Sequence, residues 1–217
     1  MNQLALALPG IGAPTFDNYY AAAGNLAASR LAAFAVAPVD TQIVLLGAAQ
    51  SGKSHLLQAV CERAREHGIR GQYVSLRRTD ATEWLDNANG TLIAVDDIDA
   101  VSEPETALAL FALLNRQHDA RRAILCAGTA LPTVLPDLHS RLMRAEQLAL
   151  PTMSDDDRRL ILSHQARQAG IPLEPAATEY LLRHHSRDLH ALMTRLDQLH
   201  RLSLEGKRRI TVAMVRG

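Results

Sequence analysis

The segment GAAQSGKSHLLQAV, Gly47 to Val60, decides how this sequence is interpreted. Its first eight residues match the pattern G-x-x-x-x-G-K-S/T. The apolar run Ile43–Leu46 precedes the loop and a segment with helical spacing follows it, as the pattern requires. Small residues allow backbone N–H groups to surround phosphate oxygens, and a helix N-terminus favours the same negative charge. The segment therefore predicts a phosphate-binding loop.

This loop predicts a bound nucleotide together with Mg²⁺. We expect the Lys53 ammonium to reach the β- and γ-phosphates and the Ser54 hydroxyl to coordinate the metal ion. The residues expected to contact the nucleotide are Gly47, Gln50, Ser51, Gly52, Lys53, Ser54 and His55.

Two adjacent carboxylates follow the apolar run Leu92–Val95. An acid at the end of a neighbouring strand holds the magnesium shell in proteins with such a loop, so Asp96 is predicted to be a magnesium ligand. Asp97 stands where an acid that orients or activates water would belong. The alternative is that both are solvated loop acids, and we interpret Asp99 as a surface or capping residue.

Composition restricts the class of protein. The 217 residues suit one large domain or a medium domain with a small companion. The 23 basic and 23 acidic residues cancel, which argues against a dedicated nucleic-acid binder. No apolar run of membrane-spanning length and no basic signal-peptide start occur, so we expect a cytoplasmic protein. Cys61 and Cys126 are interpreted as buried thiols rather than as a disulfide or a zinc site.

Short apolar runs alternate with helical segments up to Pro151 and only helical segments follow, which predicts a parallel sheet covered on both faces and then a helical lid. The predicted strands are Ile43–Leu46, Tyr73–Leu76, Leu92–Val95, Ala123–Ala127 and Leu148–Leu150. The predicted helices are Asn25–Val36, Lys53–His67, Ala81–Asn87, Glu105–Asp119, Ser154–Ala169, Ala176–His185 and Arg187–Leu204. We therefore expect a flexible tail over 1–14, an α/β core over 15–150 and a lid over 151–217. Ser154 is the expected N-cap of the first lid helix.

Several segments together resemble one family. TFDNYY (15–20), the phosphate loop, LIAVDDI (92–98) and LHSRLMR (138–144) follow the order seen in the bacterial replication initiator DnaA. SRDLHALMTRLDQL (186–199) and RRITVAMVR (208–216) extend the similarity through the lid. The resemblance implies an AAA+ P-loop core with a five-stranded parallel sheet, in the order 5-1-4-3-2, followed by a small α-helical lid.

The resemblance also assigns expected roles to individual residues. Phe16, Asn18 and Tyr19 correspond to residues that border the adenine, which implies ADP or ATP as the nucleotide. Arg141 corresponds to the arginine finger, which reaches the nucleotide of an adjacent subunit in trans. Arg187 corresponds to a sensor that contacts the phosphates in cis.

One position departs from the family pattern. The segment ILCAGTALP (124–132) places Thr129 where the family commonly has a polar sensor, often Asp. A threonine hydroxyl can bind a water molecule or a phosphate but carries no charge. We therefore expect the chain's own ATP hydrolysis to be weak at most.

The two ends of the chain refine the resemblance. The sequence stops directly after the lid, so we expect no helix-turn-helix domain and no sequence-specific DNA binding, as in the DnaA regulatory inactivators of the Hda type. Gln3, Leu4, Leu6 and Leu8 resemble the peptide that docks on the sliding clamp of the replicative polymerase, in which Gln forms hydrogen bonds and spaced aliphatic side chains fill an apolar cleft.

This resemblance implies a negative regulator of DNA replication initiation. It would bind the sliding clamp (the polymerase β subunit) and stimulate ATP hydrolysis by DnaA, near the replisome on the nucleoid. The nucleotide would mainly hold the shape of the AAA+ interface. The resemblance leaves self-association of the chain open. The alternative is an autonomous AAA+ ATPase such as a helicase loader of the DnaC type; a structural adaptor with a vestigial site is disfavoured by the complete loop.

Overall fold

The computed structural model describes residues 14–19, 26–168, 170–185, 189–206 and 209–216. The described chain divides into two compact units, one over residues 14–152 and one from residue 153 onward. Each unit has a hydrophobic core of its own, and the two are described separately.

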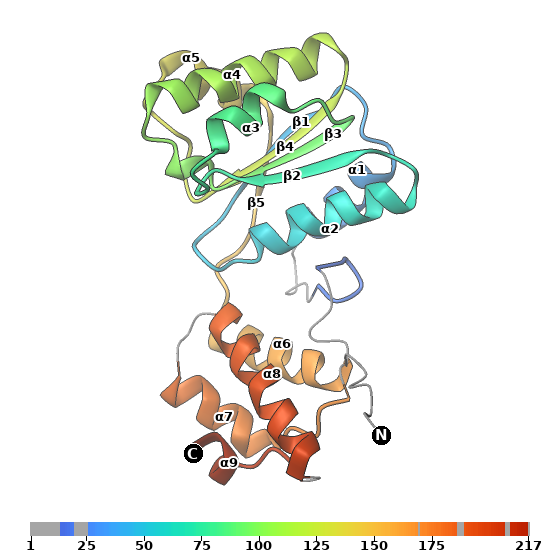
Figure 1. Ribbon diagram of the computed structural model, residues 1–217, viewed down its shortest axis with the longest axis vertical. Coiled ribbons are helices and arrows are strands. Elements are labelled where there is room, and N and C mark those ends of the chain that lie inside the picture. The colour runs from blue at the N-terminus through green and yellow to red at the C-terminus, as the bar shows by residue number, and fades with distance from the viewer. Residues whose placement is uncertain (1–13, 20–25, 169, 186–188, 207–208, 217) are drawn as a thin grey trace, which may run out of the picture. The chain divides into compact units, whose positions relative to one another are not determined.

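The first unit is built on a five-stranded parallel sheet (Figure 1). Its strands are β1 (Gln42–Leu46), β2 (Gly71–Ser75), β3 (Leu92–Asp96), β4 (Ala123–Gly128) and β5 (Glu146–Ala149). They lie in the order β2-β3-β4-β1-β5, which is the predicted order read from the opposite edge. The predicted fold class is therefore confirmed.

Helices cover both faces of this sheet, and the alternation of side chains along a strand assigns each residue to a face (Figure 1). In β1, Ile43 and Leu45 pack with α1 (Leu26–Val36) and α2 (Lys53–Glu66), whereas Val44 packs on the opposite side. That opposite face carries α3 (Ala81–Asn87), α4 (Pro104–Asp119) and α5 (Pro136–Arg144). Every residue of β3 is buried, as expected for a strand covered on both faces.

The helix α5 was not predicted. It is nine residues long, begins at Pro136, and buries only Leu138 and Leu142, one helical turn apart. Two apolar positions are too few to establish a helical period in the sequence. A short 3₁₀ turn, η1 (Ile98–Ala100), directly after β3 was not predicted either.

The second unit consists of helices α6 (Asp155–Gln168), α7 (Pro175–His184), α8 (Leu189–Gly206) and the unpredicted α9 (Val212–Arg216). Its core includes Leu162, Leu181, Leu196 and Ile210, all fully buried. Ser154 caps α6 as predicted, because its hydroxyl accepts the Asp157 N–H at 3.1 Å while Asp157 accepts the Ser154 N–H at 2.8 Å. None of the described helices is long and apolar enough to cross a membrane.

Candidate nucleotide-binding site

The predicted phosphate loop connects β1 to α2 and has the tight backbone that its sequence implies. Gln50 and Gly52 have φ angles of 62° and 94°, in the left-handed region. Gly47 cannot carry a side chain without rearrangement, because a Cβ there would lie 2.7 Å from the Ser51 Oγ. The loop is thereby closed on itself at the N-terminus of α2, where the helix dipole favours an anion.

Lys53 lies across the loop. Its Nζ donates hydrogen bonds to the carbonyl oxygens of Gly47, at 2.9 Å, and Ala48, at 2.8 Å. Burial lowers the pKa of Lys53, although the negative charges of Asp96, Asp99 and Asp97 oppose that shift. Backbone carbonyl groups thus hold the ammonium group at the loop, where the carboxylates of Asp96, Asp97 and Asp99 act on its charge.

Ser51 contributes a buried hydroxyl to the loop. The residue is 5% exposed, and its Oγ has no hydrogen-bond partner among the described residues. Buried hydroxyl groups in proteins nearly always have a partner. An unsatisfied donor beside the closed glycine loop fits a site that binds phosphate oxygens.

The predicted magnesium ligands Ser54 and Asp96 come together at the carboxyl end of β3, where the Ser54 side chain favours a lower pKa for the Asp96 carboxyl. Asp96 is 1% exposed, and it also accepts the Tyr73 hydroxyl at 3.0 Å and the Asp97 N–H at 2.9 Å. Burial raises the pKa of Asp96 and outweighs these hydrogen bonds. A hydroxyl and a carboxylate in contact form a donor set that suits Mg²⁺.

Asp97 is held in a left-handed conformation with φ of 58°. Its Oδ2 accepts the Ser75 hydroxyl at 2.6 Å, and its Oδ1 accepts the Arg77 Nε–H at 2.9 Å. Sequence reasoning missed both partners. Their position in the sequence could have identified them. Ser75 ends the strand beside β3 and Arg77 follows it by two residues, at the edge where open α/β sheets bind ligands.

Asp99 connects this acidic cluster to the end of β4. Its Oδ1 accepts the Thr129 N–H at 2.9 Å, and its Oδ2 lies 3.8 Å from the Arg77 guanidinium. Burial favours a higher pKa for Asp99, but the backbone and hydroxyl of Thr129, together with the Arg77 charge, leave that pKa lowered. The predicted sensor Thr129 is therefore tied to an acid that we interpreted from sequence as a surface or capping residue.

The segment that begins at Thr15 folds against the N-terminal turns of α2. Thr15 and Asn18 exchange hydrogen bonds at 2.8 and 3.2 Å, and the His55 Nε2–H donates to the Thr15 carbonyl at 2.9 Å. The Tyr19 ring is 5.3 Å from the His55 ring and lies against Gly52, where a Cβ would be 3.1 Å from Tyr19 Cε2. Residues expected at the adenine thus lie beside the phosphate loop.

Phe16 packs against α2, where the Arg63 guanidinium lies 5.0 Å from the centre of its ring. Arg141 stands on α5, and its Nε is buried without a hydrogen-bond partner among the described residues. Arg187 and the tail residues Gln3, Leu4, Leu6 and Leu8 lie outside the described residues, so their roles stay predictions.

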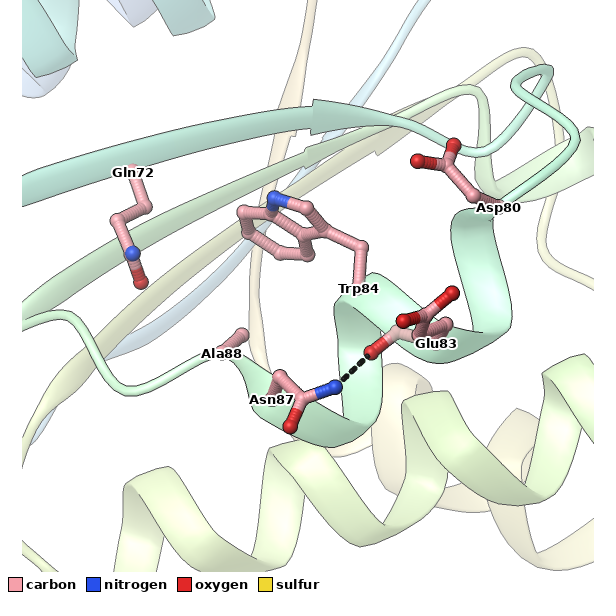
Figure 2. Close-up of a pocket in the computed structure, with 6 residues that line it drawn as sticks. All are labelled: Gln72, Asp80, Glu83, Trp84, Asn87 and Ala88. Carbon is pink, nitrogen blue, oxygen red and sulfur yellow. Dashed lines mark hydrogen bonds between the residues drawn. The ribbon is translucent and has the colours of Figure 1, made fainter.

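A separate hollow of about 330 Å³ contains none of the predicted site residues. The side chain of Trp84 extends from α3 toward Gln72 of the edge strand β2 (Figure 2). The other residues around it are Asp80, Glu83, Asn87 and Ala88. Three of the six lining residues of this hollow, Asp80, Glu83 and Asn87, are exposed and polar.

A solved structure, a family model and a relative of known sequence are similar to this chain. Domain III of the replication initiation protein DnaA from Thermotoga maritima has the same fold, with a TM-score of 0.76 and 16% identity over 93% of each chain. The family model described as "Hda, lid domain" matches residues 155–217. The chain is therefore similar to DnaA in its fold and to Hda in the sequence of its lid. A Haemophilus influenzae protein described as uncharacterized is 29% identical over 223 residues, covering 99% of this chain and 96% of that protein.

The DnaA-related fold by itself does not define an activity. DnaA from Aquifex aeolicus, in a structure bound to AMPPCP, has a TM-score of 0.69 and 20% identity over 89% of this chain and 67% of its own. RuvB from Thermotoga maritima has a TM-score of 0.64 and 16% identity over 94% of this chain and 70% of its own. The same fold thus occurs in DnaA and in RuvB, so the fold alone does not assign an activity to this chain.

Proposed function

We propose that this DnaA-related chain binds an adenine nucleotide with Mg²⁺ and acts as an Hda-like negative regulator of replication initiation. In this proposal it binds the sliding clamp and stimulates ATP hydrolysis by DnaA. The observation that carries the proposal is the Hda lid over residues 155–217, following a core with the DnaA fold and a complete phosphate loop.

The nucleotide proposal is supported by the chemistry of the site. Lys53 and the loop N–H groups would hold the phosphates, while Ser54 and Asp96 would hold Mg²⁺, which would neutralise phosphate charge when bound. The adenine would lie against the segment that contains Tyr19, close to His55. Arg187 and Thr129 would complete the phosphate contacts.

The nucleotide would set a conformation rather than drive a motor. Thr129 supplies no charge at the sensor position, and this feature favours slow hydrolysis by this chain. A nucleotide that stays bound, with ADP as the working form, would hold the phosphate loop, the end of β3 and the end of β4 in a fixed arrangement.

Arg141 would supply the chemistry that acts on DnaA. A guanidinium can neutralise the charge that develops on the γ-phosphate during hydrolysis. We propose that Arg141 meets this charge on the nucleotide of an adjacent DnaA molecule.

The tail would supply localisation. We propose that Gln3, Leu4, Leu6 and Leu8 occupy the peptide cleft of the sliding clamp, with residues 1–14 acting as a flexible tail before the core over 15–150 and the lid over 151–217. Binding to the clamp would bring the protein to the replisome on the nucleoid, within the cytoplasm, without sequence-specific contact to DNA.

The second candidate is an autonomous AAA+ ATPase such as a helicase loader of the DnaC type. The observation that favours it is the complete pair of phosphate loop and carboxylates, with Ser54 and Asp96 already in contact. A loader would bind helicase and single-stranded DNA and would hydrolyse ATP without DnaA. The balanced charge of the chain favours the regulator.

The test is a reconstitution with purified DnaA loaded with radiolabelled ATP. Wild-type protein with ADP, added with sliding clamp on DNA, is expected to convert DnaA-bound ATP to ADP much faster than either component alone. Stimulation that does not require the clamp would remove the tail proposal, and no stimulation under any condition would make the ATPase the preferred function.

A further inference from the structure

An arginine cluster, consisting of Arg70, Arg116, Arg121 and Arg122, lies at the edge of the sheet opposite to the candidate nucleotide site. Arg70 directly precedes β2 and Arg122 directly precedes β4, and β3 lies between these two strands. Arg116 belongs to the last turn of α4, and Arg121 stands next to Arg122. Because the strands are parallel, their amino ends meet at one edge, whereas the phosphate loop and Asp96 follow carboxyl ends. The cluster is therefore separate from the nucleotide chemistry.

Two arginines of the cluster donate to the same backbone oxygen. The Asn89 carbonyl accepts the Arg70 Nη2–H at 2.8 Å and the Arg122 Nη1–H at 3.2 Å. Arg116 donates to the Leu85 carbonyl at 2.6 Å, in the last turn of the helix that leads to this oxygen. Two guanidinium groups held at one oxygen repel each other, and an anion bound beside them would offset that repulsion.

The turn that carries Asn89 is fixed from within the protein. The Gln72 Oε1 accepts the N–H of Asn89 at 3.2 Å and the N–H of Gly90 at 2.8 Å. The side chain of Gln117, which is 2% exposed, donates to the Gly90 carbonyl at 3.2 Å. Groups that are already fixed lose little conformational freedom when a partner binds. The arginine cluster is therefore built on a preorganised turn.

The charge of the cluster is not neutralised in the part of the chain that the structure describes. None of its four guanidinium groups forms a salt bridge there, and neither do the exposed acids Asp86 and Asp119 in the same segments. By contrast, Arg65, Arg78 and Arg201 are exposed, and each pairs with a carboxylate. The zero net charge of the whole chain thus includes a local excess of positive charge.

We propose that the arginine cluster binds the phosphate backbone of duplex DNA without reading its sequence. A guanidinium group suits phosphate, because its planar donors can contact two oxygens at once. The segments 67–70, 86–91 and 116–122 contain no Phe, Tyr or Trp on which an unpaired base could stack, which favours duplex over single-stranded DNA. The choice of DNA over an acidic protein rests on the proposed function, in which a clamp loaded on DNA keeps phosphates close to this chain.

The first measurement is the fluorescence anisotropy of a labelled duplex titrated with the full chain, without clamp, DnaA or nucleotide. Wild type should bind with a Kd of about 10⁻⁴–10⁻⁶ M at physiological salt, as in non-specific binding. Each phosphate contact contributes about −0.9 to the slope of log K against log salt, so Arg70→Gln/Arg121→Gln/Arg122→Gln should make the slope shallower by about 2.7. Wild type should thus lose roughly fortyfold more affinity than this variant between 50 and 200 mM salt. Lysine at the same three positions should preserve the slope, because the slope counts charges.

The design keeps the fold and the net charge under control. Arg116 stays unchanged, because its hydrogen bond to Leu85 stabilises the C-terminal end of α3. Arg65→Gln/Arg78→Gln/Arg201→Gln removes the same charge from other parts of the surface, so this control variant should bind the duplex like wild type. Urea unfolding shows whether each variant is folded.

The second measurement compares the affinity for free clamp with the affinity for clamp loaded on a duplex. Wild type should bind the loaded clamp about tenfold or more tightly than the free clamp, because the tail and the arginine cluster then contact linked sites. The variant with glutamine at the three cluster positions should bind the two forms equally.

These results separate the inference from the proposed function. If wild type binds the duplex but not the clamp, the clamp proposal fails and the arginine cluster stands as a DNA-binding surface. Equal duplex affinity and equal salt slopes in wild type and the cluster variant overturn the inference, and so does an equal loss in the control variant. Absence of duplex binding by wild type also overturns it, and a loss of clamp or DnaA binding in the cluster variant would then identify a docking surface for an acidic protein.

Discussion

The Ser54 side chain interacts with the Asp96 carboxylate and favours a lower pKa for it, although 42 positions separate the two residues in the sequence. Ser54 belongs to the first turn of α2 and Asp96 ends β3. Their contact places the phosphate loop and the acidic strand end at one position, and it is the part of the candidate site that most directly suits a nucleotide with Mg²⁺.

Lys53→Ala is expected to weaken ADP binding by between about tenfold and a hundredfold, because hydrogen bonds to charged groups contribute about 1.5–3 kcal/mol. Isothermal calorimetry with Mg²⁺ measures the change. Arg65→Ala is the control, since Arg65 is exposed on the same helix and pairs with Glu62. Equal ADP affinity in wild type and Lys53→Ala would contradict the phosphate-loop assignment.

Arg141→Ala should leave ADP binding by this chain unchanged but reduce the stimulated hydrolysis of DnaA-bound ATP by roughly a thousandfold, as for an arginine finger. The reconstituted assay with the clamp on DNA measures it. Arg144→Ala, an exposed arginine one turn along α5, should retain stimulation. Full stimulation by Arg141→Ala would show that this arginine acts only within its own chain or interface.

The double variant Gln3→Ala/Leu6→Ala should lose about thirtyfold or more in affinity for immobilised sliding clamp, because truncating an anchor side chain commonly costs about 2 kcal/mol. ADP binding should be unaffected, since the tail precedes the nucleotide-binding core. Asn2→Ala provides the control outside the motif. Matching titration curves for the double variant and wild type would reject the clamp peptide and favour the helicase-loader alternative.

His55 predicts a pH dependence of stability. Burial lowers the pKa of His55, so the folded protein binds its proton less readily than the unfolded chain. As pH falls below the unfolded pKa of about 6.5, this group therefore removes stability, by at most about 1.4 kcal/mol per pH unit. Above that pH the contribution disappears.

Urea unfolding at pH 7.5 and pH 5.5 tests this sign. His55→Gln should lose less stability on acidification than wild type, because the amide can still donate to the Thr15 carbonyl but does not titrate. His67→Gln, an exposed position at the end of α2, should behave like wild type. An identical pH response in His55→Gln and wild type would contradict a lowered pKa at this position.

Local sequence patterns were sufficient to predict most of the strands and helices and the phosphate loop. Alternating apolar runs and helical periods predicted all five strands and the larger helices, because each pattern repeats over neighbouring residues and reports burial directly. The phosphate loop was equally accessible, since its chemistry is contained within eight consecutive residues. The helix α5 was missed because it buries only two leucines.

Tertiary structure alone decided which side chains meet at the site. Arg77 reaches Asp97 across 20 positions, Asp99 reaches Thr129 across 30, and His55 reaches Thr15 across 40. None of these pairs has a sequence pattern, because each depends on β3 lying between β2 and β4 or on the first residues folding back onto α2. The residue types available for chemistry can thus be identified from the local sequence. The pairing of Asp97 with Ser75 and Arg77, and of Ser54 with Asp96, cannot, because it follows from the order in which the parallel strands bring their carboxyl ends together.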